Sequence, residues 1–218
     1  WSNAVKAVGA APSGCRLVHV TDREGDCFQV MEESEAHGSG FLIRAQHDRY
    51  VHGGTDKLWS FLEKQPVLGH RTLKLPATPK RRARTARLAV RCAPVTLDPP
   101  VRDERFTTPR KVWAIYAVEE TSPGADEPVE WMLLTSEPTE GAEPSWTRVD
   151  WYTCRWVIEE YHKAEKSGCR LEASQLDDAQ DIQRLAAIVS LIAVRLLMLA
   201  QKAQNAVAGR ASATIRPN

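Results

Sequence analysis

The sequence predicts an α/β protein in which strands and short helices come first, an antiparallel β region follows, and long helices come last. Residues 16–22 and 40–45 are short apolar runs rich in β-branched side chains, as expected of buried strands. Between residues 66 and 140, apolar and polar residues alternate between Pro- and Gly-bearing loops, which is typical of antiparallel strands with one wet face. After Pro144 the apolar period becomes helical.

The elements can be assigned in chain order from these periods. Short helices are expected at residues 27–36 and 57–64, and long helices at 145–166, ending near Gly168, and at 177–206. The alternating segments predict strands at 71–75, 85–92, 111–119 and 130–135. The predicted divisions are a partial core at 1–65, a β-rich insertion subdomain at 66–143, core helices at 144–206 and a tail without structural signal at 207–218.

Length and composition indicate an ordinary globular protein. The chain has 218 residues, of which 43% are hydrophobic and 26% charged, enough for one core or for a core with an inserted subdomain. No run of about 18 apolar residues is evident, so we expect no membrane span. The longest apolar stretch, residues 185–200, is interrupted by Ser190 and Arg195 and predicts a buried or partner-facing helix.

The cysteines and the first residues indicate the expected cellular location and the extent of the protein. Five cysteines lie at scattered positions, without a C-x-x-C pair, which favours free thiols, a reducing cytoplasmic location and no structural zinc. The sequence begins at Trp1 without an initiator Met or a signal-peptide pattern, so we expect it to be part of a longer protein.

Charge is unevenly distributed along the chain although the net charge is only +1. Residues 70–111 contain twelve Lys or Arg and three Asp or Glu, a net of +9. Residues 119–143 contain eight Asp or Glu and no Lys or Arg, a net of −8. The basic block could bind a phosphate backbone, or it could be an ordinary solvated surface.

Asp22 is the first candidate for chemistry. It follows the predicted strand at residues 16–22, and the carboxyl ends of strands are where open α/β sheets place their ligands. Its carboxylate could bind Mg²⁺ and leave coordination sites open for substrate oxygens. The alternative is that Asp22 only caps the turn or helix that follows. Glu24 and Asp26 are too close to Asp22 to be independent strand-end ligands.

The second candidate is a polar stripe on the helix predicted at residues 145–166. Tyr152, Arg155, Glu159, Lys163 and Lys166 are separated by three, four, four and three residues and would share one face. One carboxylate among three cations and a phenol suits a surface that holds a metal at Glu159 with phosphates on either side. The alternative is an exposed helix with intrahelical salt bridges. Two carboxylates, Asp22 and Glu159, are few for a two-metal phosphoryl-transfer site, and no third is evident.

These segments together resemble the bacterial DDE transposases of the insertion-sequence-four family. Residues 152–166 resemble the family's Y-x-x-R-x-x-x-E-x-x-x-K-x-x-K motif, and residues 22–26 resemble its D-R-E-x-D block. Residues 131–138, WMLLTSEP, resemble the strand that precedes the motif helix. The resemblance is co-linear from about residue 14 to residue 199 and implies a partial RNase H-like core with a β-rich insertion.

The resemblance also implies roles for individual residues. Asp22 and Glu159 would be the second and third members of an acidic triad that holds Mg²⁺ or Mn²⁺. Tyr152, Arg155, Lys163 and Lys166 would contact phosphates of the transposon end, and Arg44 matches a basic residue near the active site. Trp131 matches an aromatic residue that stacks on a flipped base during hairpin formation; core packing within a strand is the alternative for this residue.

The activity implied is metal-dependent strand cleavage, hairpin formation and strand transfer on double-stranded DNA, by a homodimer in the synaptic complex. The family's first catalytic Asp, its N-terminal DNA-binding region and much of its C-terminal dimerisation region have no counterpart in this sequence. We therefore expect the segment to be inactive by itself. Glu165 stands where the family has a bulky aromatic residue, which an exposed face would tolerate. The alternatives are a truncated, non-catalytic DNA-binding remnant or inhibitory partner, and a related nuclease that does not join strands.

Overall fold

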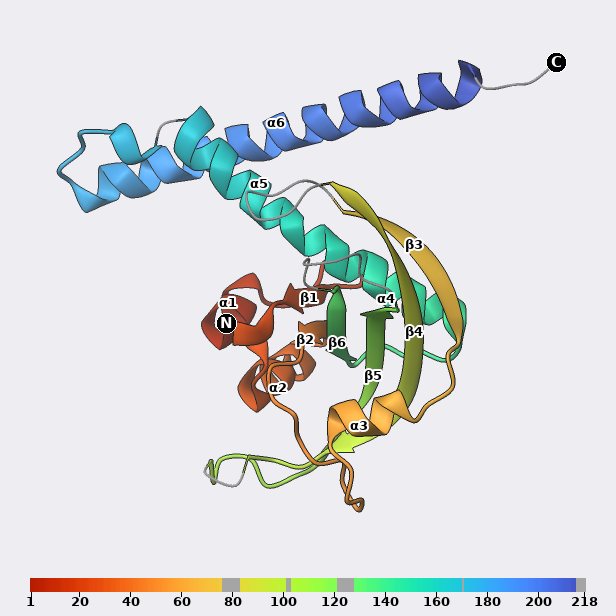
Figure 1. The fold of residues 1–218 in the computed structure, drawn as a ribbon. Helices are drawn as coiled ribbons and strands as arrows, with labels where there is room; N and C mark the ends of the chain where they lie inside the picture. The colour runs from red at the N-terminus through yellow and green to blue at the C-terminus, as the bar shows by residue number, and fades with distance from the viewer. Residues whose placement is uncertain (76–82, 101–102, 121–127, 170, 215–218) are drawn as a thin grey trace. The chain divides into compact units, whose positions relative to one another are not determined.

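The computed structural model describes residues 1–75, 83–100, 103–120, 128–169 and 171–214. The chain divides into two compact units, unit 1 at Trp1–Cys154 and unit 2 at Arg155–Asn218, and each is described by itself (Figure 1). The helical elements of unit 1 are α1 (Ser2–Val8), η1 (Arg23–Gly25), α2 (Phe28–Ala36), α3 (Leu58–Glu63) and α4 (Ala142–Thr153). Its strands are β1 (Val18–Thr21), β2 (Gly40–Arg44), β3 (Gly69–Leu75), β4 (Arg84–Leu97), β5 (Arg110–Glu119) and β6 (Glu130–Thr135).

Unit 1 is built on one curled, mixed sheet with the strand order β1-β2-β6-β5-β4-β3 (Figure 1). β1 and β2 are parallel, with Thr21 beside Ile43, and every other neighbouring pair is antiparallel. The chain therefore has a mixed α/β fold, and the strands expected from the alternating pattern are confirmed within a few residues. β3, β4 and β5 form no separate layer, because β6 hydrogen-bonds to both β2 and β5 and makes the sheet continuous.

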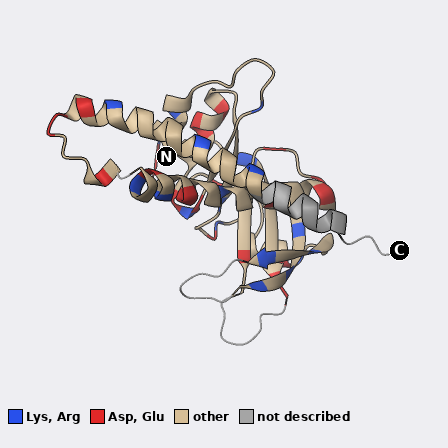
Figure 2. Ribbon diagram, turned by 90° about the horizontal axis from the view of Figure 1, so that it is seen from above, with Lys and Arg blue, Asp and Glu red and all other residues tan. Residues whose placement is uncertain are grey.

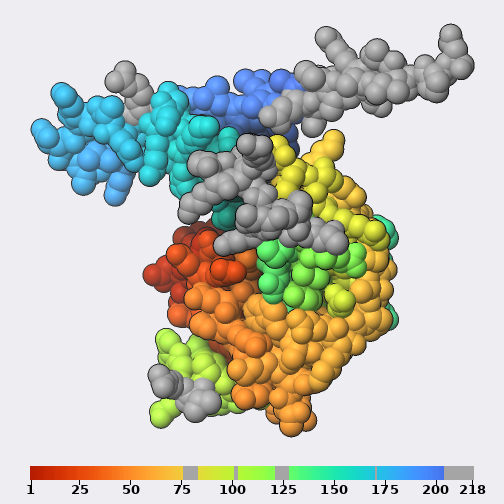
Figure 3. All heavy atoms as spheres, viewed as in Figure 1, coloured from red at the N-terminus to blue at the C-terminus, as the bar shows by residue number. Residues whose placement is uncertain are grey.

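Each face of the sheet is covered by helices, as the alternation of apolar side chains requires. One face carries residues such as Phe41 and Ile43 and packs against α1, α2 and α3. The other face, called here the α4 face, carries residues such as Leu42 and Ile115 and packs against Trp146, Val149 and Tyr152 of α4. The link between β4 and β5, yellow-green in Figures 1 and 3, projects from unit 1.

The basic and acidic blocks of the sequence neutralise one another in the folded unit. The pairs are Arg84 with Glu119, Arg87 with Glu120, His70 with Glu120, and Arg71 with Glu143 and Asp150. Figure 2 accordingly shows Lys and Arg intermixed with Asp and Glu on the strands. Antiparallel pairing of β4 with β5 contributes to this, because it sets the start of β4, in the middle of the basic block, against Glu119 at the start of the acidic one. The block taken as a whole is therefore not an unbalanced cationic surface among the described residues.

The helix expected at residues 145–166 is not one uniform α-helix. α4 ends at Thr153, and η2 (Cys154–Trp156) is a 3-10 turn. In unit 2, α5 (Val157–Lys163) follows and then η3 (Ala164–Gly168), a π-helical turn. Because the three helix types differ in residues per turn, the expected single stripe is interrupted. Val157 and Ile158 on α5 are both exposed.

The remaining elements of unit 2 are η4 (Leu171–Ala173) and α6 (Ala179–Thr214), so the helix extends beyond the expected end at 206 into the predicted tail. Among the α6 side chains that the structure describes, residues 179–203, most of the apolar ones are exposed and Val189 and Ala193 are buried. The stretch Ala179–Ala203 is long and apolar enough to cross a membrane by length and composition alone, contrary to our reading of the sequence. That criterion is weak, since a core helix of a globular protein can satisfy it too.

A polar cluster joins the two helical segments within unit 2. The Tyr161 hydroxyl lies 2.8 Å from Ser190 Oγ and 3.2 Å from Glu165 Oε1, and His162 Nδ1 lies 3.3 Å from Glu165 Oε2. The Glu165 side chain is only 14% exposed, so the expectation that it lies on an open face is wrong. The same cluster accounts for the polar residue Ser190 within the apolar stretch, because the Ser190 hydroxyl contacts the Tyr161 hydroxyl.

Candidate functional site

Asp22 lies directly after β1, at the carboxyl end of the parallel β1–β2 pair. Its extended backbone makes it the N-cap of η1, and its Oδ1 accepts a hydrogen bond from the Glu24 backbone N–H at 3.1 Å. The capping role considered from the sequence is thus present, and the side chain remains partly exposed. A hydrogen bond to Oδ1 is compatible with a second role for the same carboxylate.

Gly25 allows the chain to turn tightly behind Asp22. A Cβ atom at this position would lie 2.2 Å from Thr21 Oγ1 and 2.5 Å from Thr21 Cβ. Thr21 is buried beneath the turn. Glycine is therefore required here by the close approach of η1 to the end of β1.

Asp26 connects the loop after β1 to the loop after β2, which sequence reasoning missed. Its buried carboxylate accepts hydrogen bonds from the backbone N–H groups of Gln46 and His47 at 2.7 and 3.0 Å. Arg49 Nη1 lies 2.7 and 2.8 Å from its two carboxylate oxygens, and Arg49 Nη2 donates to its backbone carbonyl. Asp26 thus holds together the carboxyl ends of the two parallel strands, and no spacing pattern in the sequence indicates a partner 23 residues away.

Four of the residues singled out from the sequence lie on the α4 face, toward the same end of the sheet. Val20 packs against the buried residues of the α4 face. Asp22 lies two residues later in extended backbone, so its side chain is on the same side. Arg44 is two residues from Leu42 on that face, and its Nη2 donates to the Glu130 carbonyl of β6 at 3.0 Å. Strand register therefore brings the Arg44 side chain to the part of β6 that contains Trp131.

Trp131 and Tyr152 complete this group. Their rings meet edge to face with centroids 5.3 Å apart. Trp131 is half-buried against the α4 cluster, while Tyr152 is 6% exposed and belongs to it. Tyr152 thus contributes to the core, unlike the exposed members of the expected stripe, and it supports the ring of Trp131. Trp131 combines core packing with a partly exposed ring.

The other residues of the motif belong to unit 2. Arg155 Nη2 lies 2.9 Å from Glu159 Oε1, one helical turn away, and the Glu159 side chain is 43% exposed. Lys166 pairs with Glu172 at 3.2 Å, and Lys163 is exposed. Arg155 and Glu159 thus form an ion pair across one helical turn within this unit, as the alternative of an exposed helix with intrahelical salt bridges would have it. Asp22 and Glu159 are in different units and are described separately.

The donor atoms of Asp22 and Glu159 match those that Mg²⁺ and Mn²⁺ prefer, since both are carboxylates with solvent access. Among the described residues, no group of three His, Cys, Asp or Glu side chains is placed to hold a metal ion. Asp22 and Glu159 therefore have the donor chemistry that such an ion prefers, and a complete metal site would need further ligands. No family model matches the chain.

Proposed function

We propose that this chain is part of a DDE-type DNA transposase with a partial RNase H-like core, in which Asp22 and Glu159 are two of the acidic metal ligands. The observation that carries the proposal is the convergence of Asp22, Arg44, Trp131 and Tyr152 on one face and toward one end of the sheet. A carboxylate, a cation and an aromatic ring at one sheet end suit a DNA strand bound for cleavage. Bound Mg²⁺ or Mn²⁺ would activate the attacking oxygen and stabilise the leaving one.

The position of β1 at the edge of the sheet, among the strands that the structure describes, supports the same proposal. β1 is the terminal strand of the sheet and hydrogen-bonds to β2 on one side. A further strand parallel to β1 would end beside Asp22 and could supply another carboxylate there. The proposed partners are double-stranded DNA and a second copy of the protein, and the proposed setting is the cytoplasm.

Asp22→Asn is the sharpest test, because it separates catalysis from capping. Asn caps helices about as well as Asp, so this change retains the turn and removes the charge that a metal needs. In the full-length protein with Mg²⁺ and duplex DNA that carries the element's ends, we expect Asp22→Asn and Glu159→Gln each to lower the nicking rate at least about 100-fold. Binding of the same DNA should persist.

The neighbouring carboxylates provide matched controls. Glu24→Gln and Glu160→Gln alter exposed acids close to Asp22 and Glu159 and should leave nicking within about 2-fold of wild type. Unchanged nicking in Asp22→Asn would show that Asp22 serves only as a cap and would overturn the assignment. DNA binding without nicking in the full-length wild type would favour the non-catalytic remnant or inhibitory partner, and nicking without strand joining would indicate a nuclease.

A further inference from the structure

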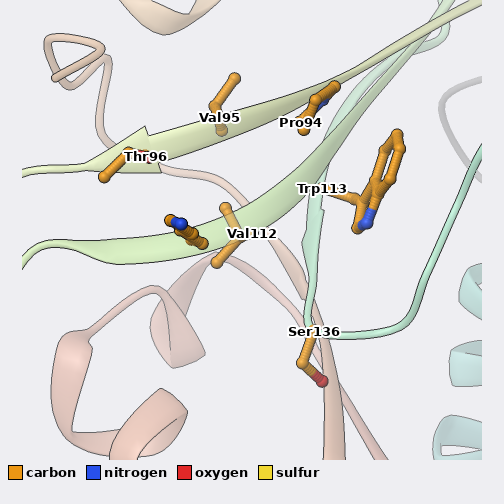
Figure 4. A pocket seen from close by; sticks show the side chains of 7 residues that line it. Pro94, Val95, Thr96, Val112, Trp113 and Ser136 are labelled. Carbon is orange, nitrogen blue, oxygen red and sulfur yellow. The ribbon is translucent and has the colours of Figure 1, made fainter. Parts of the chain in front are cut away.

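A cavity of about 510 Å³ lies on unit 1 where β4, β5 and the residue after β6 meet (Figure 4). Pro94 and Thr96 of β4 pair with Trp113 and Lys111 of β5, and Ser136 completes the lining. We call this the Trp113 groove. Its residues have no part in the site described above.

Strand register puts these side chains on one side of the sheet. Val95 and Val112 belong to the core on the opposite face, so by alternation Pro94, Thr96, Lys111 and Trp113 all project from the α4 face. Trp113 is half-buried and belongs to neither core cluster. Figure 4 shows the Trp113 indole and the ring of Pro94 on neighbouring strands of the groove.

The polar groups of the groove are available to a ligand. Within the described parts of the chain, the Trp113 indole N–H makes no hydrogen bond, and it is not one of the buried polar atoms that lack a partner. Ser136 Oγ accepts a hydrogen bond from the Phe41 backbone N–H at 3.1 Å, which leaves its own proton to donate.

The charge of the groove is positive. Lys111 is exposed, and none of the described carboxylates pairs with it. The groove's lining includes no Asp or Glu. By contrast, the neighbouring Arg110 is paired with Glu35 and Glu32. Lys111 is thus a cation beside a partly exposed aromatic ring, and this combination suits a ligand with a flat apolar part and an anion.

We propose that the Trp113 groove binds an unpaired nucleotide of single-stranded DNA, with the base stacked on Trp113 and a phosphate beside Lys111. Stacking on an aromatic ring together with a nearby cation is how proteins bind single strands without reading their sequence. An apolar or proline-rich peptide could contact Trp113 and Pro94 but would leave Lys111 without an anion. This proposal rests on the proposed DNA transposase function and adds a DNA contact that the acidic site does not supply.

The position of the groove is consistent with a strand that leaves the candidate site. Ala117, which pairs with Trp131, is four residues from Trp113 along β5. At the rise of an extended strand this separates the two positions by about 13 Å on the same face. Ile115, between them on that face, is fully buried in the cluster with α4, so a displaced strand that begins near Trp131 would have to pass around α4 to reach the groove.

The test measures binding of a fluorescently labelled single-stranded 12-mer to the full chain by anisotropy, with the duplex of the same sequence in parallel. We expect Trp113→Ala to weaken single-strand binding about 5- to 100-fold, the range that loss of one stacked base produces, and Trp113→Phe to retain most of the affinity. Lys111→Gln should weaken binding and lower the salt dependence by about 0.7 in the log–log slope. Duplex binding should change less than about 2-fold in all three variants, because its bases are not free to stack.

Two matched controls address nonspecific effects. Trp1→Ala removes another exposed tryptophan, at the N-cap of α1, and Lys6→Gln removes another exposed lysine; neither should alter single-strand binding. Circular dichroism melts would show that each variant folds. Unchanged single-strand affinity in folded Trp113→Ala and Lys111→Gln would overturn the proposal, as would a proline-rich peptide that competes for the groove more strongly than the oligonucleotide.

The outcomes separate this proposal from the proposed function. If Asp22→Asn abolishes nicking while the groove variants bind single strands normally, the groove proposal fails and the enzymatic one stands. If the groove variants lose single-strand binding while Asp22→Asn still nicks DNA, the groove proposal stands and the acidic-site assignment fails.

Discussion

Arg49 Nη1 lies 2.7 and 2.8 Å from the two carboxylate oxygens of Asp26, whose side chain has no exposed surface. The same carboxylate binds two backbone N–H groups of the loop after β2. The loop that begins with Asp22 is thereby fastened to the end of the neighbouring parallel strand. A carboxylate with this many donors is a structural anchor, and its substitution should act on Asp22 through the loop.

Asp26→Asn is expected to destabilise the protein by about 3–5 kcal/mol, the cost of leaving a buried ion pair with one partner. The measurement is urea-induced unfolding followed by circular dichroism. Asp56→Asn is the matched control, because Asp56 pairs with exposed Lys64 and its loss should cost less than about 1 kcal/mol. Equal effects of the two substitutions would show that Asp26 does not anchor the loop.

Gly25→Ala should destabilise the turn behind Asp22, since its new Cβ would lie 2.5 Å from Thr21 Cβ and a rotamer change cannot relieve that contact. We expect a loss of about 1–3 kcal/mol, the usual cost of overpacking, seen as a lower thermal midpoint. Gly168→Ala is the comparison, because a Cβ there meets nothing within 4 Å. The close-approach explanation fails if Gly25→Ala melts at the temperature of the wild type.

His19 should make unit 1 less stable in acid. Burial and, to a smaller extent, the nearby His37 lower the pKa of His19 below its usual value near 6.5. The unfolded chain therefore binds a proton at His19 more tightly than the folded chain does. The contribution of neutral His19 to the free energy of unfolding is fully present above the unfolded-state pKa. It declines as the pH falls through that value toward the folded-state pKa. Unfolding free energies at pH 7.5 and 5.5 should differ less in His19→Gln than in wild type. The exposed His47 offers a control, since His47→Gln should preserve the wild-type difference.

Tyr161→Phe should loosen the attachment of α6 to α5 within unit 2. The phenol contacts Ser190 Oγ and Glu165 Oε1, and its removal leaves the sheltered Glu165 carboxylate with fewer donors, at a cost of about 1–3 kcal/mol. Hydrogen exchange of the backbone amides around Ser190 should quicken correspondingly. Tyr50→Phe alters an exposed phenol in unit 1 and should leave that exchange unchanged. If the amides around Ser190 exchange as slowly in Tyr161→Phe as in wild type, the cluster does not attach α6 to α5.

The order and extent of most elements were readable from local patterns. Alternation of apolar residues identified β3 to β6 because a strand with one covered face must repeat every two residues. The helix at residues 145–166 was less accurately predicted. The helical period of its apolar residues was predicted correctly, but α4, η2, α5 and η3 differ in helix type. No residue pattern marked the changes of helix type after Thr153 and Lys163.

Pairing between distant segments could not be predicted, and it altered the picture of charge and of the site. Arg84 and Glu119 lie 35 residues apart, in blocks that seemed to be a cationic and an anionic surface, yet they form a largely buried pair. From the sequence, Asp26 was judged only to be too close to Asp22 to be an independent strand-end ligand. Only the partner Arg49 reveals its role, because a buried carboxylate must have donors and their identity depends on which loops meet.

The sequence by itself determined the alternation of strands and helices, the position of Asp22 at a strand end and the spacing of Arg155, Glu159 and Lys163, because each depends on residues close along the chain. Tertiary structure decided that Tyr152 is buried, that Glu165 joins two helical segments, and that Trp113 and Lys111 share a groove with Pro94. The physical reason is that burial and cross-strand contact are set by register, and register depends on all the strands together.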